Sequence, residues 1–301
     1  MAKQEAISFM QFKKKFDSEA TCRDHLYKMR WPNGFCCPKC GSLTHDVIST
    51  RNLLECADCH YQASVTVGTV MEKTHLTLEK WFWGIYFVGI DKRGCSATLL
   101  AKELEISYKS AWFMLHRIRK AMKDRDSQYV LDGLVELDDA FFGSTKEGSK
   151  RGRGTSKAKV IVGLSINDEG HPQYLKMEVV NNLKKQTIAE FAHVHIASGS
   201  TISSDAYRSY LILQKEDYQL EAKVFNPKVD SEHLKWLHTI ISNAKAFVEG
   251  TFHGLGKKHL QSYLDEFCYR FNRRFFLSEL FNRILISCIS SHRIMFAELT
   301  T

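Results

Sequence analysis

Apolar and polar residues alternate between residues 134 and 205 in a pattern that predicts a small mixed sheet. The first three apolar runs span residues 134–137, 160–166 and 174–180, with loop or turn sequences between them. Successive short strands of this kind pair antiparallel. A helical pattern over 187–197 precedes a fourth strand at 201–205. Because a crossover helix returns the chain in the same direction, the fourth strand should run parallel to the first. The fold class predicted here is mixed α/β.

The first part of the chain has helical periodicity instead. Residues 8–28 place phenylalanines near one face and predict one amphipathic helix. An apolar helix over 76–89 is followed by two helices over 96–104 and 108–123. A short turn separates the last two, and Ser107 suits the N-cap of the second. This pair resembles a helix-turn-helix, which favours DNA binding. The alternative is a plain helical hairpin with a solvated basic face.

Four cysteines between these helical regions have the spacing of a structural zinc site. They form two Cys-x-x-Cys pairs, Cys37 with Cys40 and Cys56 with Cys59. A short hairpin between two such pairs brings four thiolates together around one Zn²⁺. Zinc would supply much of the folding free energy of so small a ribbon. Both DNA and protein are candidate partners of the ribbon. The other five cysteines lack partner spacing and are interpreted as core or bystander residues.

Composition adds a polyanionic partner to this picture. The 301 residues carry a formal net charge of +8, which favours nucleic acid, although a merely basic enzyme is the alternative. No apolar run reaches the roughly 20 residues of a membrane span, and residues 1–5 lack the apolar core of a signal peptide. We therefore expect a cytoplasmic, nucleoid-associated protein whose nine cysteines are reduced.

Two of the predicted strands end in aspartate. Asp138 follows the first strand and is itself followed by Asp139, and Asp205 ends the fourth strand. The predicted topology places the ends of these two strands side by side. Carboxylate oxygens are ligands that Mg²⁺ accepts, so the pair predicts ribonuclease-H-like catalysis with one or two Mg²⁺ ions, Mn²⁺ being possible. Each aspartate taken alone also fits a turn or an N-cap.

Basic residues occur in four further places that suit phosphate contacts. They lie on the second helix of the helix-turn-helix-like pair, in a glycine-containing loop after the first strand, in a loop before residue 260, and near residue 273. The predicted DNA-binding residues are Lys109, Arg117, Lys120, Lys150, Arg151, Arg153, Lys257, Lys258, Arg273 and Arg274. The alternative for the glycine-containing loop is a solvated loop tip. The alternative for the aromatic segment that ends near residue 273 is ordinary core packing.

A helix beginning near residue 235 is the expected source of a third active-site residue. His238 and Lys245 lie on one face of it. No Asp or Glu occurs at this point, and imidazole is a less natural ligand for Mg²⁺ than carboxylate. From its chemistry alone, His238 is equally well interpreted as a metal ligand or as a core or DNA-contacting histidine.

These motifs together resemble insertion-sequence transposases of the DDE class, and the resemblance covers nearly the whole chain. Its zinc-ribbon part rests on the Trp-Pro-Asn-Gly segment 31–34, the two cysteine pairs and the segment 68–74. Its catalytic part rests on the strand 135–138 and the segments 204–210 and 257–274.

The resemblance implies DNA transposition, with Mg²⁺-dependent cleavage and then strand transfer. It implies that Asp138 and Asp205 are the first two acidic ligands, while Asp139 matches a secondary acidic position. The usual third residue is Glu, seven residues before a Lys. His238 lies seven residues before Lys245, so it is the expected third residue, and Asn243 is the second choice.

The sequence predicts four segments: an N-terminal helical segment (1–30), a zinc ribbon (31–72), a helix-turn-helix-like region (73–126) and a ribonuclease-H-like catalytic domain (127–301). The expected partners are double-stranded DNA, both terminal inverted repeats and target, and further copies of the chain in a dimer or higher oligomer. The alternatives are a DNA-binding protein whose catalytic domain is inactive and a nuclease of the same fold that does not join strands.

Overall fold

The structure is a computed structural model that describes residues 7–143, 155–223 and 233–300. The chain forms two compact units, one of Met1–Arg125 with Phe275–Thr301 and the other of Asp126–Arg274. The sequence had placed the last segment, from residue 275, in the catalytic domain. It groups with the first unit because the helix α9 (Leu280–Ser290) packs against helices of that unit.

The first unit is built mainly from helices around an aromatic core. Its helices are α1 (Phe9–Lys15), α2 (Glu19–Arg30), α3 (Leu78–Ile90), α4 (Ala97–Glu103), α5 (Tyr108–Asp126), η3 (Leu277–Glu279), α9 and α10 (Phe296–Thr300). The last residue of α5, Asp126, is counted with the second unit. Phe281 of α9 packs edge-on against Phe12 of α1 at 5.0 Å between ring centroids, and its ring is tilted against Phe82 of α3 at 5.7 Å. These contacts join segments far apart in the sequence.

The single helix predicted over 8–28 is two helices in the structure. The side chain of Ser18 accepts a hydrogen bond from the backbone N–H of Thr21 and caps a new helix, α2. Phe16, between the two helices, turns into the aromatic core and is buried. The hydrophobic period continues across this break, so the sequence pattern concealed it.

The zinc ribbon of the first unit is a three-stranded antiparallel sheet. Its strands are β1 (His45–Ile48), β2 (Leu53–Cys56) and β3 (Gln62–Ala63), in the order β1-β2-β3. Phe35, at the start of the ribbon, is buried between Trp31 and His45, with ring centroids 5.1 and 4.6 Å away. This small aromatic cluster is the main apolar packing that the ribbon contributes.

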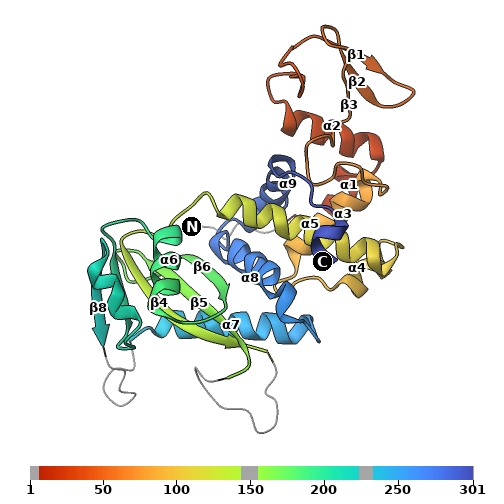
Figure 1. Cartoon of the computed structure of the whole chain (residues 1–301). Helices are drawn as coiled ribbons and strands as arrows, with labels where there is room; N and C mark the ends of the chain where they lie inside the picture. The colour runs from red at the N-terminus through yellow and green to blue at the C-terminus, as the bar shows by residue number, and fades with distance from the viewer. Residues whose placement is uncertain (1–6, 144–154, 224–232, 301) are drawn as a thin grey trace. The chain divides into compact units, whose positions relative to one another are not determined.

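The second unit contains a five-stranded mixed sheet in the order β6-β5-β4-β7-β8 (Figure 1). The strands are β4 (Leu134–Phe142), β5 (Ala158–Ile166), β6 (Pro172–Val180), β7 (Thr201–Asp205) and β8 (Gln219–Lys223). The first three pair antiparallel, and β7 pairs parallel to β4 after the crossover helix α6 (Lys185–His195). The predicted mixed α/β fold and its strand directions are therefore confirmed. Strand β8, parallel to β7, was not predicted.

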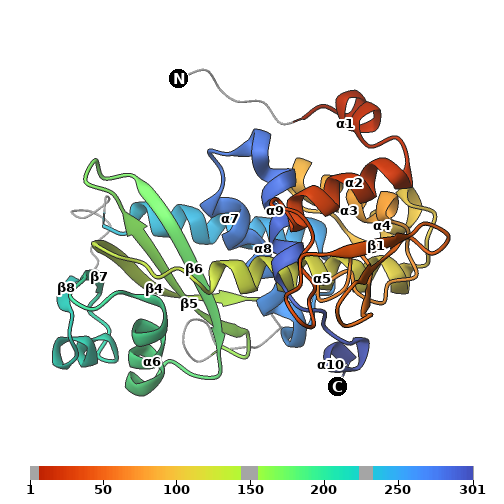
Figure 2. The same cartoon turned by 90° about the horizontal axis from the view of Figure 1, so that it is seen from above.

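Helices cover both faces of this sheet (Figure 2). On one face, Val160, Val162 and Leu164 of β5 pack with apolar residues of α7 (Lys235–Thr251) and α8 (Lys257–Asn272). On the other face, Val135 and Leu137 of β4 pack with α6 and the 3-10 helix η2 (Tyr210–Lys215). Because strand residues alternate between faces, successive residues of β4 face these two helical layers in turn.

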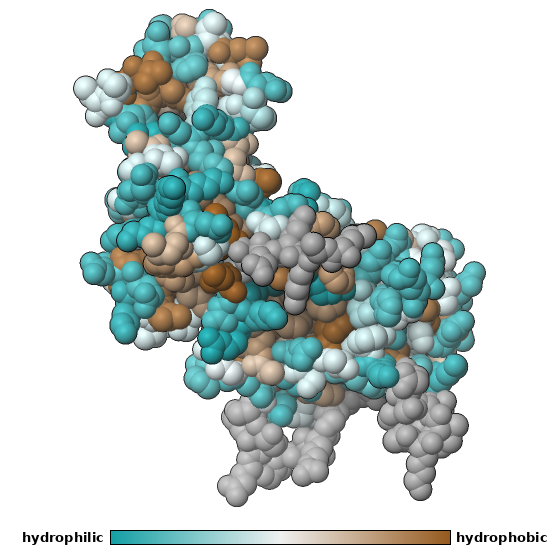
Figure 3. All heavy atoms as spheres, turned by 180° about the vertical axis from the view of Figure 1, so that it is seen from behind, coloured by the Kyte–Doolittle hydropathy of each residue, from teal (hydrophilic) through white to brown (hydrophobic). Residues whose placement is uncertain are grey.

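No helix among the residues that the structure describes is long and apolar enough to cross a membrane. Figure 3 shows one face of the molecule, where polar residues are interspersed with small apolar patches. Leu43 and Val47 of the ribbon are among the exposed apolar side chains.

Candidate active site

Asp138 lies on the face of β4 that is covered by α7. The even-numbered residues Ala140 and Phe142 belong to the core beneath α7 and α8, whereas the odd-numbered Val135 and Leu137 belong to the core beneath α6. Asp138 shares the even-numbered face, and Asp139 points to the opposite one. The strand continues to Phe142, so Asp138 is inside the strand and not at its end as predicted.

Asp205 lies beside Asp138 on the neighbouring strand. The parallel register pairs Glu136 with Ser203 and Leu137 with Ser204, and each aspartate is the next residue of its strand. In-register residues of parallel strands share a face, and neighbouring strands are roughly 4.8 Å apart. One carboxylate oxygen of Asp205 accepts a hydrogen bond from the backbone N–H of Tyr207 at 3.2 Å, which orients the side chain.

His238 completes this group from the first turn of α7. Its Nε2 atom lies 3.3 Å from Oδ2 of Asp138, and the imidazole is 46% exposed against 16% for the carboxylate. A hydrogen bond to Asp138 is the main reason that the pKa of His238 is raised above its ordinary value. Burial opposes this shift, and the charges of Glu136 and Asp205 add to it. The imidazole therefore lies in the field of three carboxylates.

Helix geometry distinguishes His238 from Asn243. At about 100° per residue, Lys245 lies within about 20° of His238 around α7, whereas Asn243 lies about 140° away. Asn243 is exposed. The structure thus brings His238, and not Asn243, to the two aspartates, with Lys245 on the same helix face.

Glu136 is a member of this group that the sequence interpretation missed. It lies on the same face of β4 as Asp138, two residues earlier, and its Oε2 atom accepts the backbone N–H of Leu237 at 3.1 Å. Burial raises the pKa of the Glu136 carboxyl, and the N–H of Leu237 and the charge of His238 partly oppose this effect. The period of two along the predicted strand was the signal that could have found it.

The donor set suits a hard divalent cation held mainly by carboxylates. Asp138 and Asp205 offer oxygen ligands on adjacent strands, and Mg²⁺ commonly keeps one or two protein carboxylates and completes its shell with water and phosphate. The ligand atoms of Asp138, Asp205 and His238 do not all lie within 4.8 Å of one another, since in the described part of the chain the four ribbon cysteines alone form such a group.

The four ribbon cysteines have the geometry of a zinc site. Cys37 and Cys59 have sulfur atoms 3.7 Å apart, and those of Cys40 and Cys56 are 3.5 Å apart. Tetrahedral Zn–S bonds of 2.3 Å require sulfur separations of about 3.8 Å. The predicted zinc ligands are therefore brought together.

The structure corrects one predicted DNA contact on α5, Arg117, and gives a second, Lys120, partners within the chain. Arg117 is buried, donates to the backbone oxygen of Glu72 at 3.3 Å and lies over the Phe113 ring, so it is a packing residue of the first unit. Lys120 forms an ion pair with Asp124 and a hydrogen bond to Ser291. Lys109 is exposed near the start of α5, with its Nζ atom 4.4 Å from the Phe296 ring centroid.

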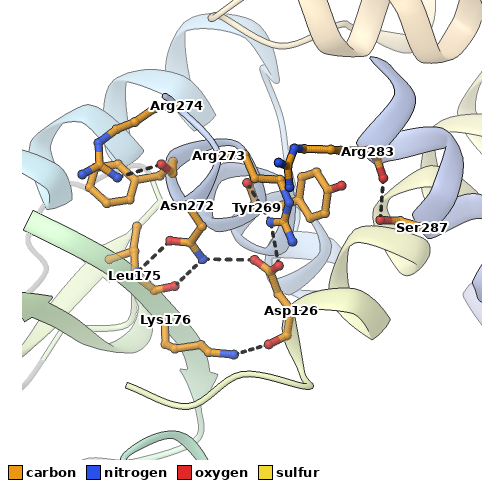
Figure 4. A network of polar contacts seen from close by, with 10 residues as sticks. Asp126, Leu175, Lys176, Tyr269, Asn272, Arg273, Arg274, Arg283 and Ser287 are labelled. Atoms are coloured by element: carbon orange, nitrogen blue, oxygen red, sulfur yellow. Dashed lines mark hydrogen bonds and ion pairs between the residues drawn. The ribbon is translucent and has the colours of Figure 1, made fainter. Parts of the chain in front are cut away.

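The structure also corrects Arg273 and Arg274, which follow α8 (Figure 4). The Arg273 guanidinium is buried, pairs with Asp126 at 2.7 Å and lies 3.6 Å from the Tyr269 ring centroid. Arg274 donates to the backbone oxygens of Pro172 and Gln173, the first two residues of β6. Arg273 is therefore an interior residue of the second unit, and Arg274 is half-buried against the edge strand β6. Sequence could show their charge but not the carboxylate and carbonyls that they meet.

Replacing Arg273 with Leu should lower the free energy of unfolding of the second unit by about 3 kcal/mol, because the Asp126 carboxylate then stays buried without its partner. Adding Asp126→Asn should recover part of that loss by removing the uncompensated charge. Urea unfolding measures both, with exposed Lys258→Ala as the control, expected within about 0.5 kcal/mol of the parent. Equal stability of the Arg273 variant and the parent would contradict this assignment.

The remaining predicted DNA contacts include two lysines, which lie in the first turn of α8 and not in the loop expected before residue 260. Lys258 is exposed at the start of α8, and neighbouring Lys257 donates to the backbone oxygen of Ser156. Lys150, Arg151 and Arg153 lie outside the described residues.

Two family models match the chain in the regions just described. The ISXO2-like transposase domain matches residues 130–272, which contain the sheet, α7 and α8. The transposase zinc-ribbon domain matches residues 17–62, which contain all four cysteines. A protein of Halobacterium salinarum, described as an uncharacterized protein in transposable element ISH50, is 28% identical over 223 residues. That match covers 68% of this chain and 73% of the relative.

Solved structures with partial similarity include a pre-cleavage Mos1 transpososome and a simian T-cell lymphotropic virus intasome in complex with a PP2A regulatory subunit. The first match has 14% identity and a TM-score of 0.27, and covers 68% of this chain and 76% of that chain. The second has 12% identity and a TM-score of 0.31, and covers 57% and 63%. The two family models extend over both the ribbon and the catalytic-site fold. The chain therefore belongs to the transposases that carry a transposase zinc ribbon and an ISXO2-like transposase domain.

Proposed function

We propose that this transposase cuts the ends of its own element and joins them to target DNA in a Mg²⁺-dependent reaction at Asp138, Asp205 and His238. The observation that carries the proposal is the convergence of these residues on one face of the sheet. Asp138 and Asp205 are in register on β4 and β7, and His238 is 3.3 Å from Asp138. Mn²⁺ is expected to replace Mg²⁺, since carboxylate and water ligands suit both ions.

The chain's own residues divide the work by their chemistry. Asp138 and Asp205 would hold the metal through carboxylate oxygens. Bound divalent ions lower the pKa of a nucleophilic water or 3′-hydroxyl and stabilise the charge of an in-line displacement at phosphorus. His238, once deprotonated, offers Nε2 as a further ligand or proton acceptor beside Asp138. Lys245, on the same helix face, would contact a phosphate of the substrate.

Double-stranded DNA is the proposed substrate, with its terminal inverted repeats bound before cleavage. Lys109, Lys257 and Lys258 are the described cations that we assign to phosphate contacts. We add Lys150, Arg151 and Arg153, which lie outside the described residues. Because an element has two ends, we expect a dimer or higher oligomer on DNA. The ribbon, with its Zn²⁺, contacts either DNA or a second protein chain.

The proposal is tested with duplex oligonucleotides that carry the inverted repeats expected just outside the reading frame. Incubation with Mg²⁺ should release a 3′-hydroxyl at the element end, and pre-nicked ends should be joined to a supercoiled target. Cleavage without joining would make the protein a nuclease of this fold. Binding without either reaction would make it a DNA-binding protein with an inactive catalytic domain.

His238→Ala should reduce the cleavage rate by about 10- to 100-fold, because the residue contacts the Asp138 carboxylate directly. Asn243→Ala, on an exposed face of the same helix, should remain within about twofold of the parent. Single-turnover cleavage of the same oligonucleotide measures both variants. The reverse ranking would make Asn243 the third active-site residue.

A further inference from the structure

Helix α7 begins without a side-chain cap of its own. Its N-cap residue is Leu234, which has a left-handed backbone (φ 53°) and an apolar side chain. The backbone N–H of His238 bonds to the oxygen of Leu234 at 2.9 Å. The N–H groups of residues 235–237 therefore lack partners within the helix, as in the first turn of any helix.

Glu136 supplies the missing cap from a different element. Its Oε2 atom accepts the N–H of Leu237, the third residue of α7, at 3.1 Å. An N-cap side chain ordinarily accepts from the second or third helical residue, so this carboxyl does the same from β4. Its negative charge also suits the positive end of a 17-residue helix.

This hydrogen bond acts one residue before the candidate active-site histidine. Leu237 is fully buried between α7 and the sheet, and His238 follows it with Nε2 facing Asp138. Glu136 and Asp138 project from the same face of one strand. A single rigid strand therefore carries both the carboxylate that His238 contacts and the carboxylate that anchors the turn bearing His238.

We propose that Glu136 is a positioning residue, which holds the first turn of α7 on β4 and so sets His238 against Asp138. This deepens the proposed function and rests on it for the identity of the site. The role requires the reach of the side chain and an acceptor oxygen. It does not require a charge, because a carboxamide oxygen accepts the same N–H.

Two substitutions separate this role from that of a direct metal ligand. Glu136→Gln keeps the length and the acceptor but removes the charge, whereas Glu136→Asp keeps the charge but shortens the reach by one methylene. A positioning residue tolerates Gln and not Asp. A carboxylate ligand, or a purely electrostatic effect on the site, gives the opposite ranking.

The first measurement uses metal-free full-length protein and the imidazole resonances of His238, assigned with a His238→Gln variant. We expect these resonances to coincide in the parent and Glu136→Gln and to shift or broaden in Glu136→Asp. The second measurement titrates the same proteins with Mn²⁺ by electron paramagnetic resonance. We expect affinity within about threefold of the parent for Gln and a loss of about tenfold or more for Asp.

The outcomes distinguish this inference from the proposed function. If the parent binds Mn²⁺ no better than Asp138→Asn, the metal site is wrong, while the imidazole resonances still test the position of His238. If Glu136→Gln perturbs those resonances as much as Glu136→Asp, or if neither substitution perturbs them, Glu136 does not position His238. Should Glu136→Asp fail to fold, Glu136→Leu, which is nearly isosteric but has no acceptor, is compared with Gln in the same way.

Discussion

Replacing Asp138 or Asp205 with Asn is expected to reduce Mg²⁺-dependent cleavage of element-end DNA by at least about 10³-fold. Each substitution keeps the shape of the side chain and removes one of the two in-register negative charges that the proposed metal site needs. Losing a preorganised charge from such a site costs about 3–4 kcal/mol or more of transition-state stabilisation. Both variants should still bind the DNA, because neither substitution changes a residue that we assign to DNA contacts.

Asp139→Asn is the matched control for this experiment. It removes the same charge from the adjacent position of the same strand, but its side chain lies on the opposite face of the sheet from Asp138 and His238. Its backbone N–H, which donates to Asp138 at 2.7 Å, is retained. We expect cleavage within about threefold of the parent. Retained cleavage in Asp138→Asn or Asp205→Asn would overturn the site, as would a large loss in Asp139→Asn alone.

Local pattern was enough to predict four of the five strands of the sheet and to bring the two aspartates onto neighbouring strands. Alternation gave three strands, a helix forced the fourth to run parallel, and that topology placed Asp138 beside Asp205. Strand β8 was not predicted because its five residues alternate between exposed and half-buried positions and contain no apolar run. It owes its place to pairing with β7, which sequence does not display.

Residues that depend on partners from other elements were harder to predict. Arg117 and Arg273 look like DNA contacts in sequence because charge is visible there and burial is not. Asp126 and Arg273 lie near opposite ends of the second unit in sequence, so no local pattern indicates that they pair. Glu136 was missed for the same reason, since its role exists only through the N–H of Leu237, in a helix that begins about a hundred residues later.

Removal of zinc is expected to unfold the ribbon while leaving the Asp126–Arg274 unit folded. The ribbon has three very short strands and one small aromatic cluster, so its own apolar burial is too small to order it. Binding of a structural zinc ion supplies roughly 10–16 kcal/mol in zinc-finger peptides at pH 7. Cys56→Ser removes a buried ligand, and we expect loss of bound zinc and rapid proteolysis between residues 36 and 63.

Cys36→Ser is the matched control, because Cys36 adjoins the first ligand pair but is exposed and stands outside the four-cysteine group. It should keep one zinc per chain and resist the protease. The same two variants also decide what the ribbon contacts. If Cys56→Ser weakens binding to element-end DNA at least about tenfold while Cys36→Ser does not, the ribbon belongs to the DNA-binding surface. If both bind DNA like the parent but Cys56→Ser no longer assembles into oligomers, the ribbon contacts protein. Zinc retained by Cys56→Ser would contradict the assignment of the site.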